Sequence, residues 1–133
     1  MPYLNVRISS EESPEIAEKI VTALMIHTNK ILGKKPEVTS IEINFVSPKQ
    51  WFVGGTCMSE QNAVTFYLDI KITEGTNTKA EKAKYVKNVF SDMEDIIGPI
   101  TPASYIVIHD VRADSWGFQG NTQEFRFIQT QLL

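Results

Sequence analysis

Apolar and polar residues alternate at the beginning of the chain. Leu4, Val6 and Ile8 share one face of an extended segment, and Asn5 and Arg7 lie on the other. This period of two predicts a β-strand that starts almost at the first residue. Chain ends usually fray unless a sheet holds them. We therefore expect the first residues to be fixed in a sheet.

A helix and a second strand follow. Ser13 is a good N-cap residue, and Pro14 suits the first helical position. Apolar residues then recur at helical spacing until Gly33, where we expect the helix to end. Residues 40–45 alternate between polar and apolar and predict the second strand, which Pro48 ends.

The same order of elements then recurs. Residues 66–72 alternate and predict a third strand. Thr78 and Glu81 have the spacing of a capping box, so a second helix should begin there and continue to Gly98. Residues 105–109 predict a fourth strand.

The two halves correspond at a spacing of about 65 residues. Pro36 corresponds to Pro102, and Trp51 corresponds to Trp116. We therefore expect one domain over residues 1–133. It would consist of a first repeat at 2–62, a second repeat at 63–120 and a C-terminal tail at 121–133.

This repetition predicts an α/β (α+β) fold. A helical crossover makes the two strands of each βαβ unit parallel. Two such units form a four-stranded mixed sheet with two helices on one face. The other face would remain bare and apolar, and we expect another subunit to cover it.

Composition narrows the classes of function. The chain has 133 residues, 42% of them hydrophobic, and a net charge of −3. Its lysines are dispersed, so neither nucleic acid nor a membrane is an expected partner. No apolar run reaches transmembrane length, and no signal peptide is visible. The single Cys57 excludes an internal disulfide and fits a reducing cytoplasm, where we expect the protein to act.

Pro2 is the first candidate for chemistry. If Met1 is removed, as a small second residue favours, Pro2 becomes N-terminal and carries a secondary amine. A terminal amine has a pKa of ~7.7–8.0, which burial or a nearby cation lowers. A neutral amine fixed in a pocket is a base or a nucleophile. The first eight residues alone favour a Pro2 without any role, and the rest of the chain changes that balance.

An initial proline, two βαβ repeats and two Trp–Gly segments together resemble the tautomerase superfamily. Its members include 4-oxalocrotonate tautomerase, malonate semialdehyde decarboxylase, cis-3-chloroacrylic acid dehalogenase and macrophage migration inhibitory factor. The resemblance covers residues 2–120 approximately. It implies two fused units per chain, a homotrimer and catalysis by Pro2, with no cofactor and no metal.

The resemblance also implies further site residues. Lys34 matches an active-site lysine of migration inhibitory factor, and Tyr105 matches a site tyrosine of that protein. The segment that contains Trp116 and Phe118 is similar to the end of the decarboxylase. Each residue also has a structural interpretation: Lys34 suits a helix C-terminus, and the aromatic residues suit packing.

Three further residues complete the candidate substrate-binding set. Lys71 and Arg112 are the remaining cations that we would test as partners of an enolate oxygen. Trp51 is, like the second tryptophan, a candidate for the wall of the pocket. Core or interface packing is the interpretation that the sequence favours for it.

The sequence departs from the family at its arginines. The two arginines of the 4-oxalocrotonate enzyme fall near Glu12 and Glu42, and the arginine pair of the decarboxylase falls at Glu74 and Thr76. The water-activating acid of the decarboxylase falls near Thr39. Arginine is the natural receptor for a carboxylate. Which cation would bind an acidic substrate therefore stays open.

The leading hypothesis is a cofactor-free tautomerase that acts on a small 2-oxo acid or its enol, with Pro2 as the base. A second hypothesis keeps Pro2 protonated as an acid for hydration, dehalogenation or decarboxylation, with Glu42 or His109 activating water. A third is a non-catalytic trimeric scaffold for binding or signalling, which the missing arginines motivate.

Overall fold

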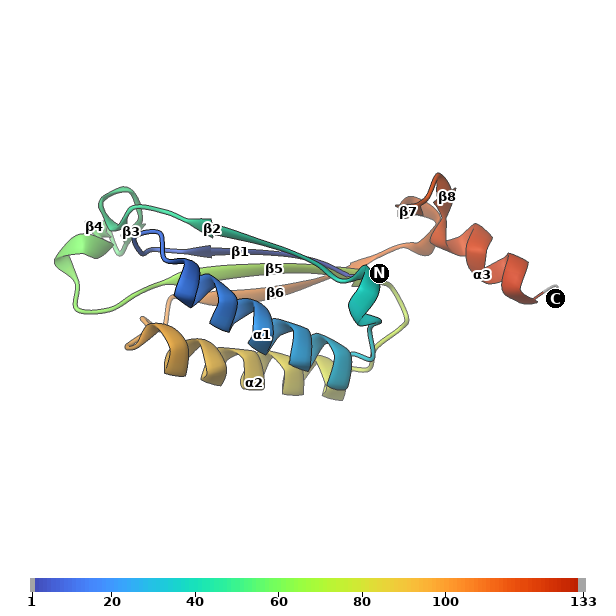
Figure 1. Ribbon diagram of the computed structural model, residues 1–133, viewed down its shortest axis with the longest axis horizontal. Helices are drawn as coiled ribbons and strands as arrows, with labels where there is room; N and C mark the ends of the chain where they lie inside the picture. The colour runs from blue at the N-terminus through green and yellow to red at the C-terminus, as the bar shows by residue number, and fades with distance from the viewer. Residues whose placement is uncertain (1, 132–133) are drawn as a thin grey trace.

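The computed structural model describes residues 2–131 and consists of a sheet layer and a helix layer (Figure 1). Four strands form the sheet in the order β2-β1-β5-β6. Their bounds are β1 (Tyr3–Ile8), β2 (Ser40–Phe45), β5 (Phe66–Thr73) and β6 (Tyr105–Val111). β1 is parallel to β2, β5 is parallel to β6, and β1 pairs antiparallel with β5. The predicted mixed sheet of two fused βαβ units is confirmed.

The long helices α1 (Pro14–Lys30) and α2 (Lys79–Ile97) cover the same face of the sheet (Figure 1). Ser13 caps α1, because its side chain accepts a backbone N–H at 3.2 Å. Thr78 and Glu81 form the expected capping box of α2. No helix in the described part of the chain is long and apolar enough to cross a membrane.

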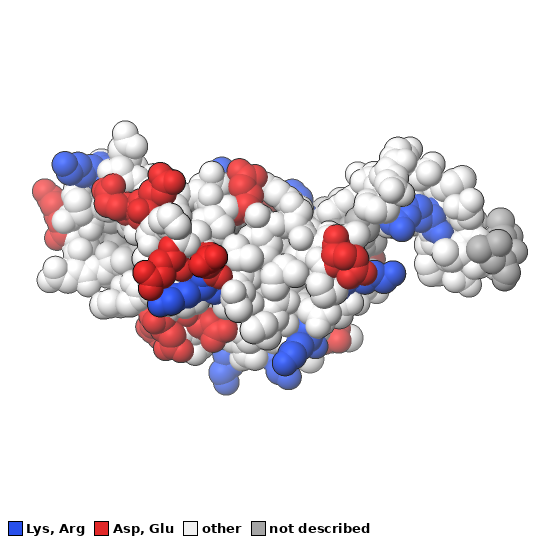
Figure 2. Space-filling model, in the orientation of Figure 1, with Lys and Arg blue, Asp and Glu red and all other residues white. Residues whose placement is uncertain are grey.

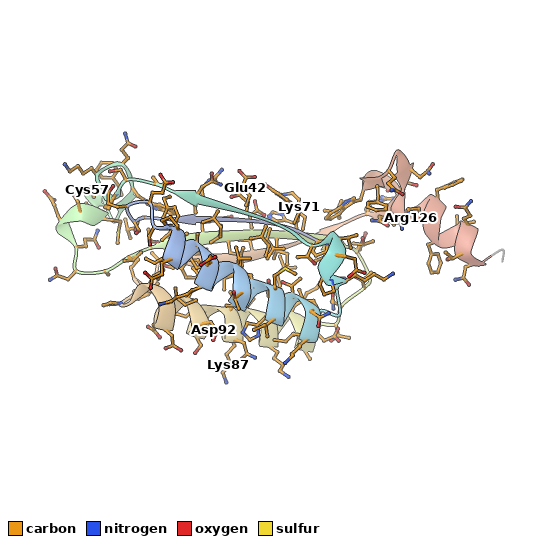
Figure 3. All side chains as sticks on the ribbon, in the orientation of Figure 1. Glu42, Cys57, Lys71, Lys87, Asp92 and Arg126 are labelled. Atoms are coloured by element: carbon orange, nitrogen blue, oxygen red, sulfur yellow. The ribbon has the colours of Figure 1, made fainter. Side chains whose placement is uncertain are left out.

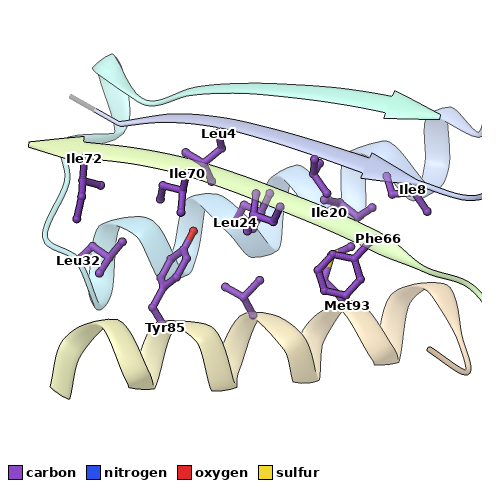
Figure 4. Packing of buried hydrophobic residues seen from close by; sticks show 13 residues of the cluster. Leu4, Ile8, Ile20, Leu24, Leu32, Phe66, Ile70, Ile72, Tyr85 and Met93 are labelled. Atoms are coloured by element: carbon purple, nitrogen blue, oxygen red, sulfur yellow. The ribbon is translucent and has the colours of Figure 1, made fainter. Parts of the chain in front are cut away.

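The hydrophobic core lies between this sheet face and the two helices (Figure 4). Its buried members are Leu4, Val6, Ile8, Ile20, Leu24, Leu32, Phe66, Leu68, Ile70, Ile72, Tyr85, Val89 and Met93. The Tyr85 hydroxyl lies 3.0 Å from Thr28 Oγ1, and both side chains are fully buried. Burial raises the pKa of Tyr85 to about 12.

Short elements connect the two repeats. The first repeat ends in a small hairpin, β3 (Phe52–Val53) with β4 (Thr56–Cys57). Two 3-10 turns flank the hairpin, η2 (Pro48–Gln50) and η3 (Met58–Glu60), and a third, η1 (Pro36–Val38), lies between α1 and β2. The hairpin contains the predicted Gly turn, since Gly54 and Gly55 both have a positive φ.

The C-terminal segment projects beyond the end of the sheet (Figure 1). We call residues 112–131 the arm. It contains η4 (Ala113–Ser115), β7 (Gly117–Phe118), β8 (Asn121–Thr122) and α3 (Gln123–Gln131). Residues 121–133 were expected only as a tail, so the helix α3 was not predicted. Three apolar side chains of α3 are more than half exposed: Phe125, Phe127 and Ile128.

The sheet face opposite the helices is polar and aromatic, so the expectation of a bare apolar face was wrong. The alternation that buries Leu4 and Ile70 turns their neighbours outward. The outward residues are Tyr3, Asn5, Arg7, Ser40, Glu42, Asn44, Tyr67, Asp69, Lys71, Thr73, Tyr105, Val107, His109 and Val111, of which only the two valines are aliphatic. We call this surface the open face.

Candidate active site

Pro2 lies at the start of β1 and is buried. Its carbonyl oxygen accepts a hydrogen bond from the Ser40 N–H at 3.2 Å. The next residue, Tyr3, pairs with Ser40 of β2 on one side and Lys71 of β5 on the other. The sheet therefore holds the beginning of the chain from both sides. Met1, whose removal we expect, lies outside the described residues.

Lys34 follows the turn that ends α1. Gly33 has a φ of +68°, a conformation that suits glycine, and it redirects the chain toward the β1 end of the sheet. The Lys34 side chain is buried, and its Nζ donates to Thr76 Oγ1 at 2.8 Å. Burial lowers the pKa of Lys34, while the carboxylates of Glu81 and Asp110 act against this shift.

A cavity of about 340 Å³ opens between the Lys34 loop and the arm. Its lining residues are Gly33, Lys34, Lys35, Glu37, Val38, Phe118 and Arg126. Val38 is two residues from Ser40, which is hydrogen-bonded to Pro2. Pro2, Lys34 and Phe118 are therefore brought to the same end of the sheet.

Arg126 is a basic residue that our sequence analysis missed. Its guanidinium carbon lies 4.2 Å from the centre of the Phe118 ring, and its Nη1 donates to Gln123 Oε1 at 3.1 Å. The only sequence signal was a cation between the aromatic residues Phe125 and Phe127. A cation between two aromatic residues does not by itself indicate a site. Only the fold of the arm shows that Arg126 lies over Phe118.

Trp116 and Arg112 also belong to the arm, but neither lines this cavity. Trp116 is partly buried, and its carbonyl accepts the N–H of Gln123 at 2.8 Å. The Arg112 side chain is 73% exposed, and its Nη2 donates to Asp114 Oδ2 at 3.1 Å. Arg112 borders a separate cavity of about 530 Å³ with the acidic residues Glu74, Asp110, Asp114 and Glu124.

Trp51 and Tyr105 lie at the opposite end of the sheet. Both line a cavity of about 390 Å³ together with Tyr67, whose ring centre is 6.3 Å from that of Tyr105. Tyr67 pairs with Arg7 near the end of β1, whereas Pro2 precedes its beginning. Within one chain, the candidate residues therefore form two groups at opposite ends of the sheet.

Lys71 points to the open face near the beginning of β1. Its Nζ lies 3.6 Å from Asp69 Oδ1. His109 Nε2 lies 2.6 Å from the same oxygen, an ion-pair distance, although the groups are not aligned for a hydrogen bond. Lys71 therefore shares a carboxylate with His109.

Glu42 is also on the open face. It stands near the position where the 4-oxalocrotonate enzyme has its second arginine. The Tyr3 hydroxyl donates a hydrogen bond to Glu42 Oε1 at 2.6 Å. This hydrogen bond lowers the pKa of Glu42 and raises the pKa of Tyr3. Asn44 Nδ2 donates to Glu42 Oε2 at 3.2 Å. The carboxylate is thus stabilised in its ionised form.

Metal ligands do not gather anywhere in residues 2–131, since no three His, Cys, Asp or Glu side chains there are placed to hold one ion. The charged side chains that line the cavity beside Lys34 are the ammonium groups of Lys34 and Lys35, the guanidinium of Arg126 and the carboxylate of Glu37.

Comparisons with known proteins agree with the fold described above. Residues 67–126 match the model of a family described as tautomerase enzyme. No curated protein matches the chain. Among solved structures, a fused 4-OT described as an asymmetric trimer superposes with a TM-score of 0.82 at 16% identity, over 93% of this chain and 98% of that one.

Two further structures have the same fold. Pt0534 inactivated by 2-oxo-3-pentynoate has a TM-score of 0.82 at 10% identity, covering 93% of this chain and 98% of its own. A macrophage migration inhibitory factor homologue from Prochlorococcus marinus has a TM-score of 0.73 at 21% identity, covering 90% and 97%. The second repeat thus matches the tautomerase family model, and the two repeats together have the fold of the fused 4-OT structures.

Proposed function

We propose that the protein is a cofactor-independent tautomerase that interconverts the keto and enol forms of a small 2-oxo acid, with Pro2 as general base. The observation that carries the proposal is a buried Pro2, held by the sheet at the same end as the buried Lys34. Removal of Met1 would turn the Pro2 nitrogen from an amide into a secondary amine at this position.

In the proposed reaction, the Pro2 nitrogen removes a proton from the carbon next to the carbonyl group and later returns one to the product. A base whose pKa matches the working pH contributes ~10²–10⁴-fold to the rate. The Lys34 ammonium stabilises the oxygen on which negative charge develops. Thr76 supports this role, because its Oγ1 accepts a hydrogen bond from Lys34 Nζ and fixes the position of the ammonium group.

We further propose that the protein acts as a homotrimer. Pro2 and Lys34 lie at one end of the sheet, and Trp51 and Tyr105 lie at the other. These groups can meet only across a subunit boundary, where the Tyr105 end of one chain would complete the Pro2 end of its neighbour. The trimeric state of the fused 4-OT structures supports this arrangement.

The geometry favours this reaction over hydration, dehalogenation or decarboxylation with a protonated Pro2. Those reactions would need Glu42 or His109 to activate water. Both residues point to the open face, where Glu42 accepts from Tyr3 and His109 lies beside Asp69.

Turnover of 2-hydroxymuconate and of the enol of phenylpyruvate tests the proposal. We expect activity in the wild type, an activity loss of at least ~10²-fold in Pro2→Ala, and the same loss when one extra residue precedes Pro2. Lys87→Gln, at an exposed position of α2 (Figure 3), is the control and should keep full activity. Equal turnover in all four proteins would contradict the proposal.

Labelling gives a second readout. 2-Oxo-3-pentynoate inactivates the structurally similar Pt0534, so we would treat this chain with it and locate the adduct by mass spectrometry. An adduct on Pro2 is the expected result. An adduct only at Cys57 or a lysine would show that Pro2 is not the reactive amine.

A further inference from the structure

A cavity of about 890 Å³ lies on the helix layer, and all of its lining residues belong to α1 or α2. We call it the helix hollow. Its lining residues are Glu15, Ala17, Glu18, Lys19, Val21, Thr22, Ala23, Ile26, Asp92, Asp95 and Ile96. It is separate from Pro2, because Pro2 precedes β1 whereas α1 begins after β1 has ended.

The helix hollow has an apolar lining. Five of its residues are apolar: Ala17, Val21, Ala23, Ile26 and Ile96. Ile26 is 45% exposed and is one of the large apolar side chains that the core does not cover. The volume of the hollow corresponds to roughly two turns of an α-helix about 10 Å across. An apolar groove of this size suits the apolar face of a further helix.

Carboxylates from both helices surround these apolar residues. Glu15 and Glu18 lie near the start of α1, and Asp92 and Asp95 lie near the end of α2. Figure 2 shows acidic side chains gathered at this end of the helix layer. Lys19 is the single cation of the lining, and its Nζ lies 3.6 Å from Glu15 Oε1. The hollow is therefore negative, and its charge is complementary to a basic partner.

The acids of α2 are placed against the helix dipole. A helix C-terminus carries partial negative charge, so a cation is favoured there. The last turn of α2 instead contains Glu94 and Asp95 and no basic residue. Asp92 has a structural partner, since its Oδ2 lies 2.5 Å from His27 Nε2, but within residues 2–131 neither Glu18 nor Asp95 takes part in a salt bridge. Local preferences that are broken in this way are typical of functional sites.

We propose that the helix hollow binds a basic amphipathic helix of a partner protein. The apolar residues of this helix, spaced at i, i+3, i+4 and i+7, pack on Ile26 and Ile96. Its lysines or arginines face Glu18 and Asp95. This docking surface is additional to the proposed tautomerase function and leaves the Pro2 end of the sheet open.

A second copy of the chain fits the hollow less well. Three of the large exposed apolar side chains of the chain lie on α3, but the only charged residues of this helix are Glu124 and Arg126. The helix therefore has no net positive charge to match the hollow. Small acids and nucleic acids would be repelled by the four carboxylates.

Peptide binding, measured by fluorescence anisotropy, tests the proposal. The probe is a fluorescein-labelled peptide of about 14 leucine and lysine residues with its leucines on one helical stripe, and the reference is a scrambled peptide of the same composition. The double variant Glu18→Lys/Asp95→Lys should lose affinity by about tenfold or more, and Ile26→Ser by about threefold or more. Glu124→Lys, which reverses an exposed acid on the arm, is the control and should bind as the wild type does.

Stability separates a binding role from a structural one. Asp95→Lys places a cation near the C-terminal end of α2, so its melting temperature should equal or exceed that of the wild type while its affinity for the peptide falls. The double variant should also turn over the enol of phenylpyruvate as the wild type does.

Equal affinity of the wild type and the double variant for the striped peptide would refute the proposal, and so would equal binding of the striped and scrambled peptides. A lower mass of the double variant than of the wild type in sedimentation velocity, without peptide, would assign the hollow to contacts between copies of the chain and would also refute it. If the peptide binds as expected but the wild type turns over no enol, the docking surface stands and the tautomerase function fails.

Discussion

Replacing Tyr85 by phenylalanine should remove an alkaline loss of stability that the wild type shows. The Tyr85 hydroxyl is fully buried, 3.0 Å from Thr28 Oγ1, and burial raises its pKa from 10.0 to about 12. Between these two values the unfolded chain has lost the phenol proton while the folded chain still holds it. The folded state then binds more protons, so its stability falls as the pH rises.

The magnitude follows from the two pKa values. The wild type should lose about 1.4 kcal/mol relative to the variant by pH 11 and roughly 2 kcal/mol by pH 12, at ~1.36 kcal/mol per unit. Near neutral pH the phenol is protonated in both states. There the variant should be less stable by about 1 kcal/mol, because the Thr28 hydroxyl loses its partner.

Urea denaturation of both proteins at equal concentration, at pH 8, 10, 11 and 12, measures this difference. The two stability curves should converge as the pH rises and then cross. A constant difference between wild type and Tyr85→Phe over the whole range would refute the reasoning, because it would mean that the phenol titrates alike in the folded and unfolded chains.

Four further outcomes follow from the structure. Leu24→Ala in the core should lower the free energy of unfolding by ~2–5 kcal/mol in urea denaturation, and a loss under ~1 kcal/mol would mean that this site is not packed as described. Gly33→Ala should cost ~1–2 kcal/mol from backbone strain alone, since its φ is +68° and no atom lies within 4 Å of the added Cβ, and unchanged stability in urea denaturation would argue against this turn. Thr78→Ala should lower the melting temperature through a loss of ~1 kcal/mol from the capping box of α2, and an equal Tm would show that the cap is not needed. The pH dependence of kcat/KM for the enol of phenylpyruvate should fall on the acid side, because protonation inactivates the Pro2 base, and a fall only on the alkaline side would assign Pro2 as an acid.

Most of the fold could be predicted because its signals are local. Strict alternation in residues 3–8 and 66–72 defines the central strands, and the caps at Ser13 and Thr78 define the helix starts. The repeat then gives the topology. The helix α3 escaped prediction because it is short and because its apolar side chains Phe125, Phe127 and Ile128 are exposed instead of packed in the core.

The candidate site was less accessible from the sequence. Motifs identified Pro2 and Lys34 separately, but only the strand register shows that they share one end of the sheet while Tyr105 lies at the other. Arg126 lies over Phe118 because the turn between β7 and β8 reverses the chain, and Gly120 in this turn has a φ of +85°. A contact that depends on such a turn leaves no periodic signal in the sequence.

The protonation state of the Pro2 nitrogen tests the central claim most directly. We would label proline with ¹⁵N, verify by mass that Met1 is absent, and follow the Pro2 amine by NMR between pH 4 and 10. The account predicts a single titration below the ~7.7–8.0 of an ordinary terminal amine, and therefore a substantially neutral base at neutral pH. A pKa at or above that range, or a chain that retains Met1, would contradict it.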